Sequence, residues 1–341
     1  MEIAFQYRPI QKRNQSGLIL AGLACIFALS GVGCDSHEQV RIAVIPQTEG
    51  TTQWDPAHTG AEVAAHSAGI FVYWNAPTRE DDVEAQIALV NRVVDAHYQG
   101  LVLAPDQALS LITPVRRALA QGIPTVIIGS PLLIPAGGNL SYILNNDEEG
   151  GRLAAERVAR LLNGRGTVAL LGINSDVSGI MIRERAFEQT LARSHPGIRI
   201  VEKRMGTFNV PHEQQVAEDT LKANPDLDVI VALMSTSIDG ALFALNTTAE
   251  SHSIRVIGFD DNGLPPLDQN KSLDCVIQED TRTMGQQAIE HIHARLHGQP
   301  VPPIIRIDPK IITRENIQTP EVRLMLFQDW TLGRWRWSSI Q

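Results

Sequence analysis

Short apolar runs rich in β-branched residues alternate with amphipathic stretches along most of the chain. Residues 41–45 (RIAVI) are typical of a buried strand, and residues 81–97 carry apolar side chains three or four positions apart, the spacing of a helix. The same criteria predict strands at 41–45, 70–74, 100–104, 125–128, 141–144, 167–171, 198–204, 229–233 and 255–259. They predict helices at 61–67, 81–97, 110–120, 149–162, 180–192, 211–223, 239–246 and 281–297.

This alternation indicates an α/β protein with parallel sheets. Apolar strands joined by amphipathic helices are typical of sheets that helices cover on both faces. The pattern runs twice, over about 105 and then about 115 residues, and each run is long enough for a domain. We therefore expect two similar, doubly wound parallel-sheet domains, which also fits a chain of 341 residues.

Polar residues gather where the predicted strands end. In open parallel sheets, ligands bind beyond the carboxyl ends of the strands. Trp54 and Phe208 are the aromatic residues among these segments. The segments that follow the strands are 46–54, 75, 105–106, 129–130, 145–147, 172–175, 206–209, 234–237 and 260–261.

Composition and charge exclude several classes of protein. The chain is 43% hydrophobic and 20% charged, which is ordinary for a globular protein. Its formal net charge of −9 argues against a nucleic-acid surface, which needs a basic face. Neither a phosphate-binding loop nor a GxSxG nucleophile motif occurs, and three cysteines cannot form a disulfide framework. We therefore expect no cofactor and no catalytic set.

Three groups of ionisable residues have a structural explanation. His293 and His297 are four positions apart on one predicted helix, a spacing that can bind a metal, but a solvated helix end is the simpler interpretation. The carboxylates of 147–149 open a predicted helix, where they favour its dipole and need no catalytic role. Cys275 is expected to be a small buried residue.

The start of the chain has the pattern of an export signal. Basic residues precede residues 17–33, which carry no charge, and small residues then lead to Cys34. This ending resembles the lipobox of bacterial lipoproteins, which implies removal of residues 1–33 and lipidation of Cys34. The alternative is an uncleaved anchor helix, although the uncharged stretch of 17 residues is shorter than the roughly 20 that span a bilayer.

Four motifs carry a resemblance to a known family. They are NNDEEGG at 145–151, RERAF at 183–187, GALFAL at 240–245 and VIGFD at 256–260. In their order and spacing the chain resembles the type I periplasmic binding proteins, from about residue 40 to 313. It is similar to the ribose-binding branch and to the sensor core of lac-repressor-type regulators. Those regulators begin with a helix-turn-helix, whereas this chain begins with a signal segment, so the transport branch fits better.

The resemblance implies two lobes joined by a three-strand hinge, with the ligand held in a cleft between them. Crossovers are expected near 144–146, 277–280 and 303–306, with Asn145 and Asn146 in the hinge. The implied division is a signal peptide at 1–33, a first lobe at 40–145 plus 280–304, a second lobe at 146–279 plus 305–314, and a Trp- and Arg-rich extension at 315–341.

The resemblance also implies ligand contacts. Trp54 matches the aromatic residue that stacks on a sugar face, Arg183 the arginine that forks onto its oxygens, and Asp260 the aspartate that accepts from its hydroxyls. These residue types suit a sugar, which presents an apolar face and an edge of hydroxyls. The candidate ligand-binding residues are Trp54, Asp106, Ser130, Arg183, Phe208, Asn209, Met234, Ser235, Asp260 and, as alternatives for the family's hinge glutamine, Gln278 and Glu279.

Two departures from the family pattern bear on the ligand. Residues 130–131 are Ser-Pro where ribose binders have Asp-Arg, and residues 234–235 are Met-Ser where they have Asn-Asp. Two polar sugar contacts would be lost. An ordinary aldopentose is therefore a poor expectation, and a less hydroxylated, larger or more apolar ligand is the alternative.

The candidate residues also have structural interpretations. Trp54 could pack on the surface of a lobe, and Arg183 could lie in a solvated helix turn paired with Glu184 or Glu188. Asp260 could cap the turn that follows it. In the C-terminal extension, the alternating Trp and Arg residues of 330–337 are expected to pack against a lobe, with a membrane or partner contact as the alternative.

Together these features predict an extracytoplasmic solute-binding protein that is anchored to the membrane by a lipid. It would capture a sugar or sugar-like solute and deliver it to the permease of an ABC importer. A sensor subunit of the same fold, feeding a chemoreceptor or histidine kinase, is the alternative. An enzyme is disfavoured because no nucleophile–base pair is evident, and no cofactor, metal or nucleic-acid partner is expected.

Overall fold

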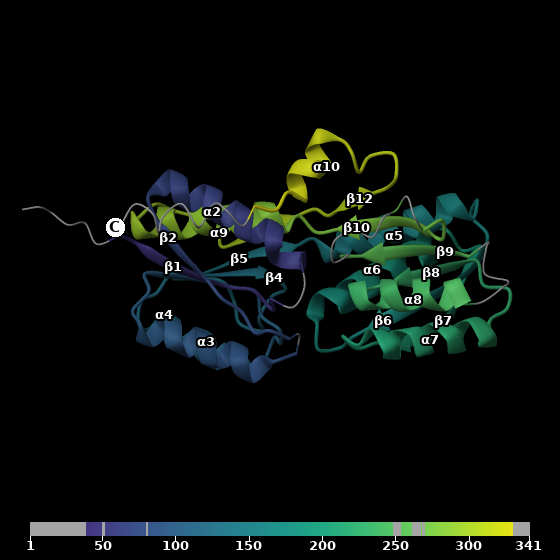
Figure 1. Ribbon diagram of the computed structural model, residues 1–341, viewed down its shortest axis with the longest axis horizontal. Coiled ribbons are helices and arrows are strands. Elements are labelled where there is room, and N and C mark those ends of the chain that lie inside the picture. Colours follow the sequence, from purple (N-terminus) through teal and green to yellow (C-terminus); the bar gives the residue numbers. More distant parts are fainter. Residues whose placement is uncertain are drawn as a thin grey trace, which may run out of the picture. The chain divides into compact units, whose positions relative to one another are not determined.

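The computed structural model describes residues 39–49, 52–79, 81–247, 254–260, 267 and 270–329. These residues form two six-stranded sheets, each covered by helices on both faces (Figure 1). The predicted signal segment, the lipidation site Cys34 and the C-terminal Trp/Arg residues of 330–337 lie outside the described residues. Within the described part of the chain, none of the helices is both long and apolar enough to cross a membrane.

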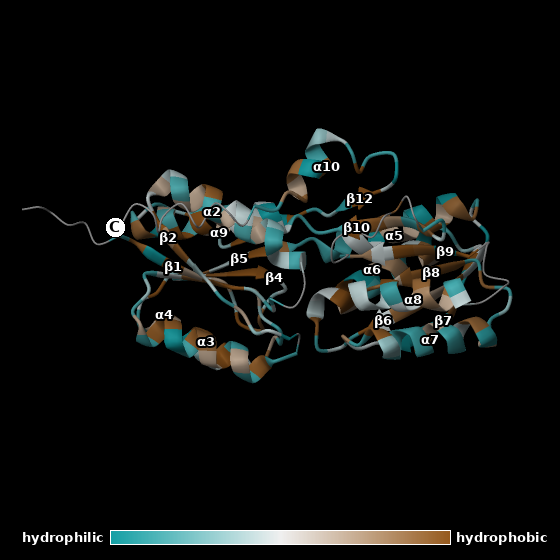
Figure 2. Cartoon of the chain, in the orientation of Figure 1, coloured by the Kyte–Doolittle hydropathy of each residue, from teal (hydrophilic) through white to brown (hydrophobic). Residues whose placement is uncertain are grey.

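The first lobe is built on a fully parallel sheet. Its strands are β1 (Arg41–Ile45), β2 (Phe71–Trp74), β3 (Gly100–Leu103), β4 (Thr125–Gly129), β5 (Leu140–Asn145) and β11 (Ile304–Ile307). Its helices are the 3-10 turn η1 (Thr52–Trp54), α2 (Asp55–Ala68), α3 (Val83–Asp95), α4 (Ile112–Ala120) and α9 (Thr281–Leu296). The strand order is β11-β5-β4-β3-β1-β2. Apolar side chains pack α2 and α9 against one face, and α3 and α4 against the other. In Figure 2 the strands between these helices are largely coloured as hydrophobic.

The second lobe repeats this arrangement. Its strands are β6 (Gly166–Ile173), β7 (Ile198–Met205), β8 (Val229–Ala232), β9 (Arg255–Phe259), β10 (Leu273–Gln278) and β12 (Lys310–Ile312), in the order β12-β10-β9-β8-β6-β7. Its helices are α5 (Asp147–Leu161), α6 (Ser178–Ser194), α7 (Val210–Ala223), α8 (Ser235–Thr247) and α10 (Pro320–Met325). Only β12 runs antiparallel to its neighbour. The predicted fold class, two similar doubly wound parallel-sheet lobes, is confirmed.

Three segments connect the two sheets. The chain leaves the first sheet at Asn145, returns to the first lobe between Gln278 and Thr281, and crosses again between Ile307 and Lys310. The first two crossings lie where the family pattern implied them. The third lies later than residues 303–306, because β11 pairs with β5 in the first sheet through Ile307.

Local signals fix most element boundaries. Asn146, Asn209 and Asp280 each accept a backbone N–H with the side chain at the start of a helix, which satisfies a donor that the helix leaves free. Helix α2 begins at Asp55, earlier than predicted, because Pro56 is tolerated in a first helical turn. Strand β10 was not among the predicted strands, since Asp274 interrupts its apolar run; that carboxylate is held by Arg157 at 2.6 and 2.9 Å.

The described part of the C-terminal extension contacts both lobes. Val322 and Met325 of α10 are buried in the apolar core of the second lobe. Further along, the Asp329 backbone N–H donates to Thr59 Oγ1 of α2 at 2.8 Å, and Arg282 of α9 donates to the Phe327 carbonyl. The segment up to residue 329 therefore packs against protein, and the expectation for the Trp and Arg residues of 330–337 stays a prediction.

Candidate functional site

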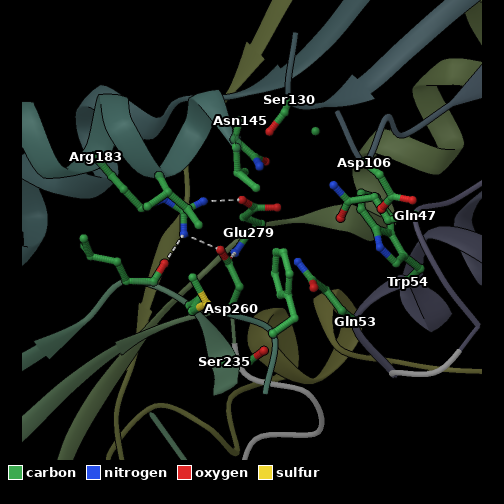
Figure 3. A pocket seen from close by; sticks show the side chains of 16 residues that line it. Gln47, Gln53, Trp54, Asp106, Ser130, Asn145, Arg183, Ser235, Asp260 and Glu279 are labelled. Atoms are coloured by element: carbon green, nitrogen blue, oxygen red, sulfur yellow. Dashed lines mark hydrogen bonds and ion pairs between the residues drawn. The ribbon is translucent and has the colours of Figure 1, made fainter. Parts of the chain in front are cut away.

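The carboxyl ends of strands from both sheets line one cleft, which encloses about 700 Å³ with its open mouth included (Figure 3). We call its first-lobe side the first wall and its second-lobe side the second wall. The first wall consists of Gln47, Gln53, Trp54, Asp106, Gly129, Ser130 and Asn145. The second wall consists of Val177, Ile180, Arg183, Phe208, Leu233, Met234, Ser235, Asp260 and Glu279.

Trp54 belongs both to the core of the first lobe and to the cleft. It ends η1 and directly precedes α2, and only 3% of it is exposed. Its ring lies against Gly129, where a Cβ atom would come within 3.2 Å of Trp54 Cη2. Gly129 also has φ +75°, a conformation that favours glycine. The surface-aromatic alternative for Trp54 is therefore wrong: the backbone of Gly129 leaves room for the indole to pack inside the lobe.

The indole N–H of Trp54 is a buried donor. In the described part of the chain Nε1 has no hydrogen-bond partner, although a buried Trp N–H normally finds one. Asn145 Oδ1, also on the first wall, is a buried acceptor without a partner there. A bound molecule that accepts from Trp54 and donates to Asn145 would satisfy both atoms.

Buried amide bonds hold the loops of the first wall. Gln47 Nε2 donates to the Pro105 carbonyl at 3.1 Å. Gln86, fully buried on α3, donates to the carbonyls of Pro46 and Ala104 and accepts from the Asp106 backbone N–H. The ends of β1 and β3 are thus tied together. Sequence reasoning did not single out Gln47 or Gln53 as lining residues, although both lie in the polar segment that follows β1.

Arg183 is the centre of the second wall. It lies on α6, is 5% exposed, and contacts three carboxylates: Asp147 Oδ1 at 2.8 Å, Asp260 Oδ2 at 2.5 Å and Glu279 Oε1 at 2.7 Å. The dashed lines in Figure 3 mark its contacts with Asp260 and Glu279. We call these four residues the Arg183 cluster. The solvated-turn alternative is wrong for Arg183, because Glu184 and Glu188 pair with Lys203 instead.

All five N–H groups of Arg183 are used within the protein. Nε and one Nη2 hydrogen donate to Asp147, and the other Nη2 hydrogen donates to Glu279. Nη1 donates to Asp260 and to the Leu233 carbonyl. Since a guanidinium has five donors, Arg183 has none left over for a ligand in this arrangement. It positions the carboxylates that face the cleft.

Asp147 is a member of the cluster that sequence reasoning missed. We interpreted it as a carboxylate that favours the α5 dipole, but it is 6% exposed and accepts two bonds from Arg183. Gly179 makes room for it, because a Cβ there would lie 2.8 Å from Asp147 Oδ2. A charged residue in a first helical turn is commonly solvated. Only the tertiary contact with Arg183 therefore distinguishes a buried ion-pair partner from a solvated carboxylate that favours the helix dipole.

A hydrogen bond joins the Asp260 side chain to the backbone of Glu279. Asp260 has φ +52°, and its Oδ1 accepts the Glu279 backbone N–H at 3.1 Å. The Asn145 amide of the first wall acts on the Glu279 carboxyl and tends to lower its pKa. The turn that Asp260 could cap, at 262–263, lies outside the described residues. Both carboxylate oxygens of Asp260 accept hydrogen bonds within the cluster, one from Arg183 and one from the Glu279 backbone.

The cluster shares one positive charge among three carboxyl groups. Burial, and then the nearby Asp260 carboxylate, raise the pKa of Glu279 well above its ordinary value of 4.5, although Arg183 acts in the opposite direction. Burial likewise raises the pKa of Asp147, against the influence of Arg183. For Arg183, burial alone would lower the pKa, but Asp260, Asp147 and Glu279 outweigh it and raise it.

Most of the remaining candidates lie in the cleft. Ser130, Phe208, Met234 and Ser235 line it, as do Asp106 and Asn145. Three candidates do not line it. Asn209 caps α7, with Oδ1 accepting from the His212 backbone N–H at 3.0 Å, and Asn146 caps α5 and donates to Asp308 Oδ1 at 2.7 Å. Gln278 is the buried last residue of β10, so at the hinge it is Glu279 that faces the cleft.

The histidines of α9 do not form a metal centre in the described structure. His297 Nδ1 contacts the His293 carbonyl at 2.8 Å, and His291 Nε2 contacts the Pro302 carbonyl at 3.0 Å. Among the described residues, no three His, Cys, Asp or Glu side chains are grouped so as to hold a metal ion. Cys275 is fully buried, and burial raises the pKa of its thiol. It is therefore an unreactive core residue.

Comparison with known proteins identifies the family. A family model described as a periplasmic binding protein domain matches residues 42–300, more than half of the chain. The D-ribose/D-allose-binding protein of Pseudomonas aeruginosa is 23% identical over 259 residues, 74% of this chain and 81% of that protein. The D-allose-binding periplasmic protein of Escherichia coli is 26% identical over 230 residues, 65% of this chain and 73% of that protein.

Solved structures show the same fold. An ABC transporter solute-binding protein from Agrobacterium vitis, crystallised with α-D-tagatopyranose, has a TM-score of 0.77 at 23% identity. The alignment covers 85% of this chain and all of that chain, 100%. The chain therefore belongs to the type I periplasmic binding protein family. It is a binding protein rather than an enzyme, and its family implies an extracytoplasmic location.

Proposed function

We propose that the protein captures a sugar or sugar-like small molecule in the cleft between its lobes and delivers it to an ABC importer. The observation that carries this proposal is the meeting of both sheets' strand ends around one cleft, with Trp54, Asn145, Asp106 and Glu279 among its lining residues. An indole and several carboxylates and amides are the groups that recognise the apolar face and the hydroxyl edge of a sugar. The names of the relatives support a sugar as the ligand.

Two-lobed binding also suits delivery. A ligand that contacts both walls stabilises the arrangement in which both are engaged, by its differential affinity for that state. The three connections between the sheets at 146, 279–280 and 308–309 are the places where such a change would be absorbed. A transporter that recognises the ligand-bound arrangement would then receive loaded protein selectively.

A calorimetric and thermal-unfolding screen tests the proposal. The purified protein is titrated with D-ribose, D-allose, D-apiose, D-tagatose and xylitol, and with neutral hexoses. A ligand at 100 times its dissociation constant adds about 2.7 kcal/mol to the free energy of unfolding. We expect at least one sugar-like compound to bind at a single site. If no compound binds, the proposal is refuted.

A matched pair of tryptophan variants locates the site. Trp54→Phe removes the buried, unpartnered N–H of a residue that lines the cleft, whereas Trp74→Phe changes a tryptophan of β2 that packs edge-on against His58, with ring centroids 4.9 Å apart. We expect Trp54→Phe to weaken binding by about tenfold, the effect of one lost hydrogen bond, and Trp74→Phe to leave it within about twofold. Equal effects would argue against binding in this cleft.

We also propose that Cys34 carries the membrane anchor. The support is the basic start, the uncharged stretch 17–33 and the small residues before Cys34. Several acyl chains on one residue would hold the protein durably at the membrane, whereas one would not. Cys34→Ala is expected to abolish incorporation of labelled fatty acid and to release the protein from membranes. Labelling that survives the substitution would contradict the proposal.

A further inference from the structure

The charges that line the cleft are predominantly negative. Of its lining residues, Asp106, Asp260 and Glu279 carry carboxylates and Arg183 carries the guanidinium. Asp147 adds a further carboxylate directly behind Arg183. Carboxylates thus outnumber the positive charge, and they come from both walls. A small polar ligand that enters this cleft meets a negative field from two sides.

Arg183 does not offset this field for a ligand. Its five N–H groups are all engaged by Asp147, Asp260, Glu279 and the Leu233 carbonyl. An anionic ligand group could take one of these donors only by displacing a buried carboxylate or carbonyl from it. The displaced group would then be buried without a partner, which is unfavourable.

Two sequence features also favour a negatively charged cleft. The hinge residue that faces the cleft is Glu279 rather than its neighbour Gln278, which places a carboxylate where an amide would be neutral. On the first wall, Ser130 is followed by Pro131, so this strand end supplies no cation. In Figure 3 the Glu279 carboxylate points into the open space towards Gln47 and Asp106.

Unpartnered atoms on the first wall indicate what kind of ligand group is missing. Asn145 Oδ1 is a buried acceptor with no partner in the described structure. The Asn145 side chain is also near enough to Glu279 to lower the pKa of that carboxyl. An N–H donor placed between Asn145 and Glu279 would satisfy the amide oxygen and the carboxylate together. An ammonium group has three donors and a positive charge, so it fits both requirements.

We propose that the preferred ligand is a polyhydroxylated ring that carries a protonated amine, such as an amino sugar or aminocyclitol, whose ammonium group lies against Glu279 and Asn145. This inference rests on the proposed function, because it names the ligand class of the same cleft. A neutral sugar satisfies fewer of the carboxylates, and a sugar acid is repelled by them.

The raised pKa of Glu279 fits this arrangement. The groups that face Glu279 are Arg183, Asp260, Asp147 and Asn145, and burial, followed by Asp260, raises its pKa. The cluster therefore retains a proton more readily than isolated carboxylates do. An ammonium group beside Glu279 favours the ionised carboxylate, so it lowers this pKa and draws the proton off.

Matched ligand sets test the proposal by calorimetry. The probes are D-glucose, D-glucosamine and D-glucuronate, the corresponding galactose and mannose sets, and myo-inositol with its monoamino derivative. Titrations are made at about pH 6, where a sugar amine is protonated. In every set in which any member binds, we expect the amine to bind at least about tenfold more tightly than its neutral partner, and the acid not to bind.

Charge variants identify the residues responsible. Glu279→Gln is expected to reduce the ratio of amine affinity to neutral-sugar affinity by about tenfold. Glu149→Gln removes a carboxylate on α5 that pairs with Arg152 outside the cleft, and it is expected to leave the preference unchanged. Asp106→Asn, on the opposite wall, is the second cleft variant and is also expected to reduce the preference.

The outcomes separate the two proposals. A neutral sugar that binds as tightly as its amine, or a preference that survives both Glu279→Gln and Asp106→Asn, overturns the amine assignment and leaves the sugar-binding function standing. A preference that Glu149→Gln reduces equally overturns the role of the cleft carboxylates. If neither the amines nor the neutral sugars of both panels bind, the proposed function fails and this inference fails with it.

Discussion

On the first wall of the cleft, Trp54 is held by packing against Gly129 and by the core of its lobe. On the second wall, Arg183 is held by three carboxylates and a carbonyl. Packing holds the indole ring in place, and its buried N–H has no hydrogen-bond partner in the described structure. The ion cluster uses every donor of its arginine, so its carboxylates are fixed in place. The first wall thus holds its aromatic residue by packing, whereas the second wall holds its arginine by ion pairs and hydrogen bonds.

The largest effect is expected when the centre of the Arg183 cluster on the second wall is removed. Arg183→Met leaves Asp147, Asp260 and Glu279 buried without a countercharge, so we expect a loss of about 3–5 kcal/mol in the free energy of unfolding. Urea denaturation measures the change. Arg152→Met breaks an ion pair on α5 that is partly exposed and is expected to cost at most about 1 kcal/mol.

A second substitution checks the cause of that loss. Asp147→Asn introduced into Arg183→Met removes one of the uncompensated charges, so part of the stability should return. A loss below about 1 kcal/mol in Arg183→Met would contradict the view that the guanidinium holds three buried carboxylates. Additive losses in the free energy of unfolding from Arg183→Met and Asp147→Asn would contradict the same view.

On the first wall, two glycines of similar backbone geometry isolate the contact with Trp54. Gly129 has φ +75° and faces the indole at 3.2 Å, whereas Gly122 has φ +78° and nothing within 4 Å of the added carbon. Gly122→Ala should cost about 1–2 kcal/mol from backbone strain alone. Gly129→Ala should cost about 1 kcal/mol more, because the methyl group displaces the ring. Equal losses in the free energy of unfolding, measured by chemical denaturation, would mean that the Trp54 ring moves aside without cost.

The smallest expected effect is a difference in pH dependence between the lobes. In the second lobe the raised pKa of Glu279 means that the folded protein holds a proton more tightly than the unfolded chain. The stability from that proton is complete below pH 4.5, the ordinary pKa, and is lost as the pH rises through the raised pKa. Glu279→Gln should therefore flatten the decline of stability above pH 4.5.

In the first lobe, buried His58 acts in the opposite sense. Burial lowers the pKa of His58 to about 4 from 6.5, so its contribution is complete above pH 6.5 and is lost as the pH falls through about 4. The free energy of unfolding is measured by urea denaturation as a function of pH for both variants. His58→Asn should change it at acid pH, and Glu279→Gln should change it towards neutral pH. Variants that both change it over the same pH range would contradict this division between the lobes.

The fold followed from local patterns because each strand and helix carries its own periodicity. β-branched runs predicted most of the strands, and Trp54, Asp106, Ser130 and Asp260, which follow the carboxyl ends of predicted strands, line the cleft. Local patterns failed where a polar side chain interrupts a strand, as Asp274 does in β10. Whether the lining positions contact a ligand is a prediction that the binding experiments decide.

The cluster itself could not be derived from one sequence. Arg183 lies 36 residues from Asp147 and 96 from Glu279, and nothing in the local pattern marks a charged helix residue as buried. The same limit explains Asp147, whose position in a first helical turn fits a solvated carboxylate equally well. The choice between Gln278 and Glu279 also depended on tertiary structure, because adjacent residues at a strand end face different directions.

Net proton exchange on binding tests the central claim most directly, namely that the second wall presents a charged cluster to the ligand. The tightest-binding amine of the panel is titrated by calorimetry at about pH 7 in buffers of different ionisation enthalpy. Because a sugar amine can itself gain a proton on binding, the native protein is compared with Glu279→Gln in the same titration. The account predicts that the native protein releases more protons, or takes up fewer, than Glu279→Gln does. Equal proton exchange by the two proteins would contradict it.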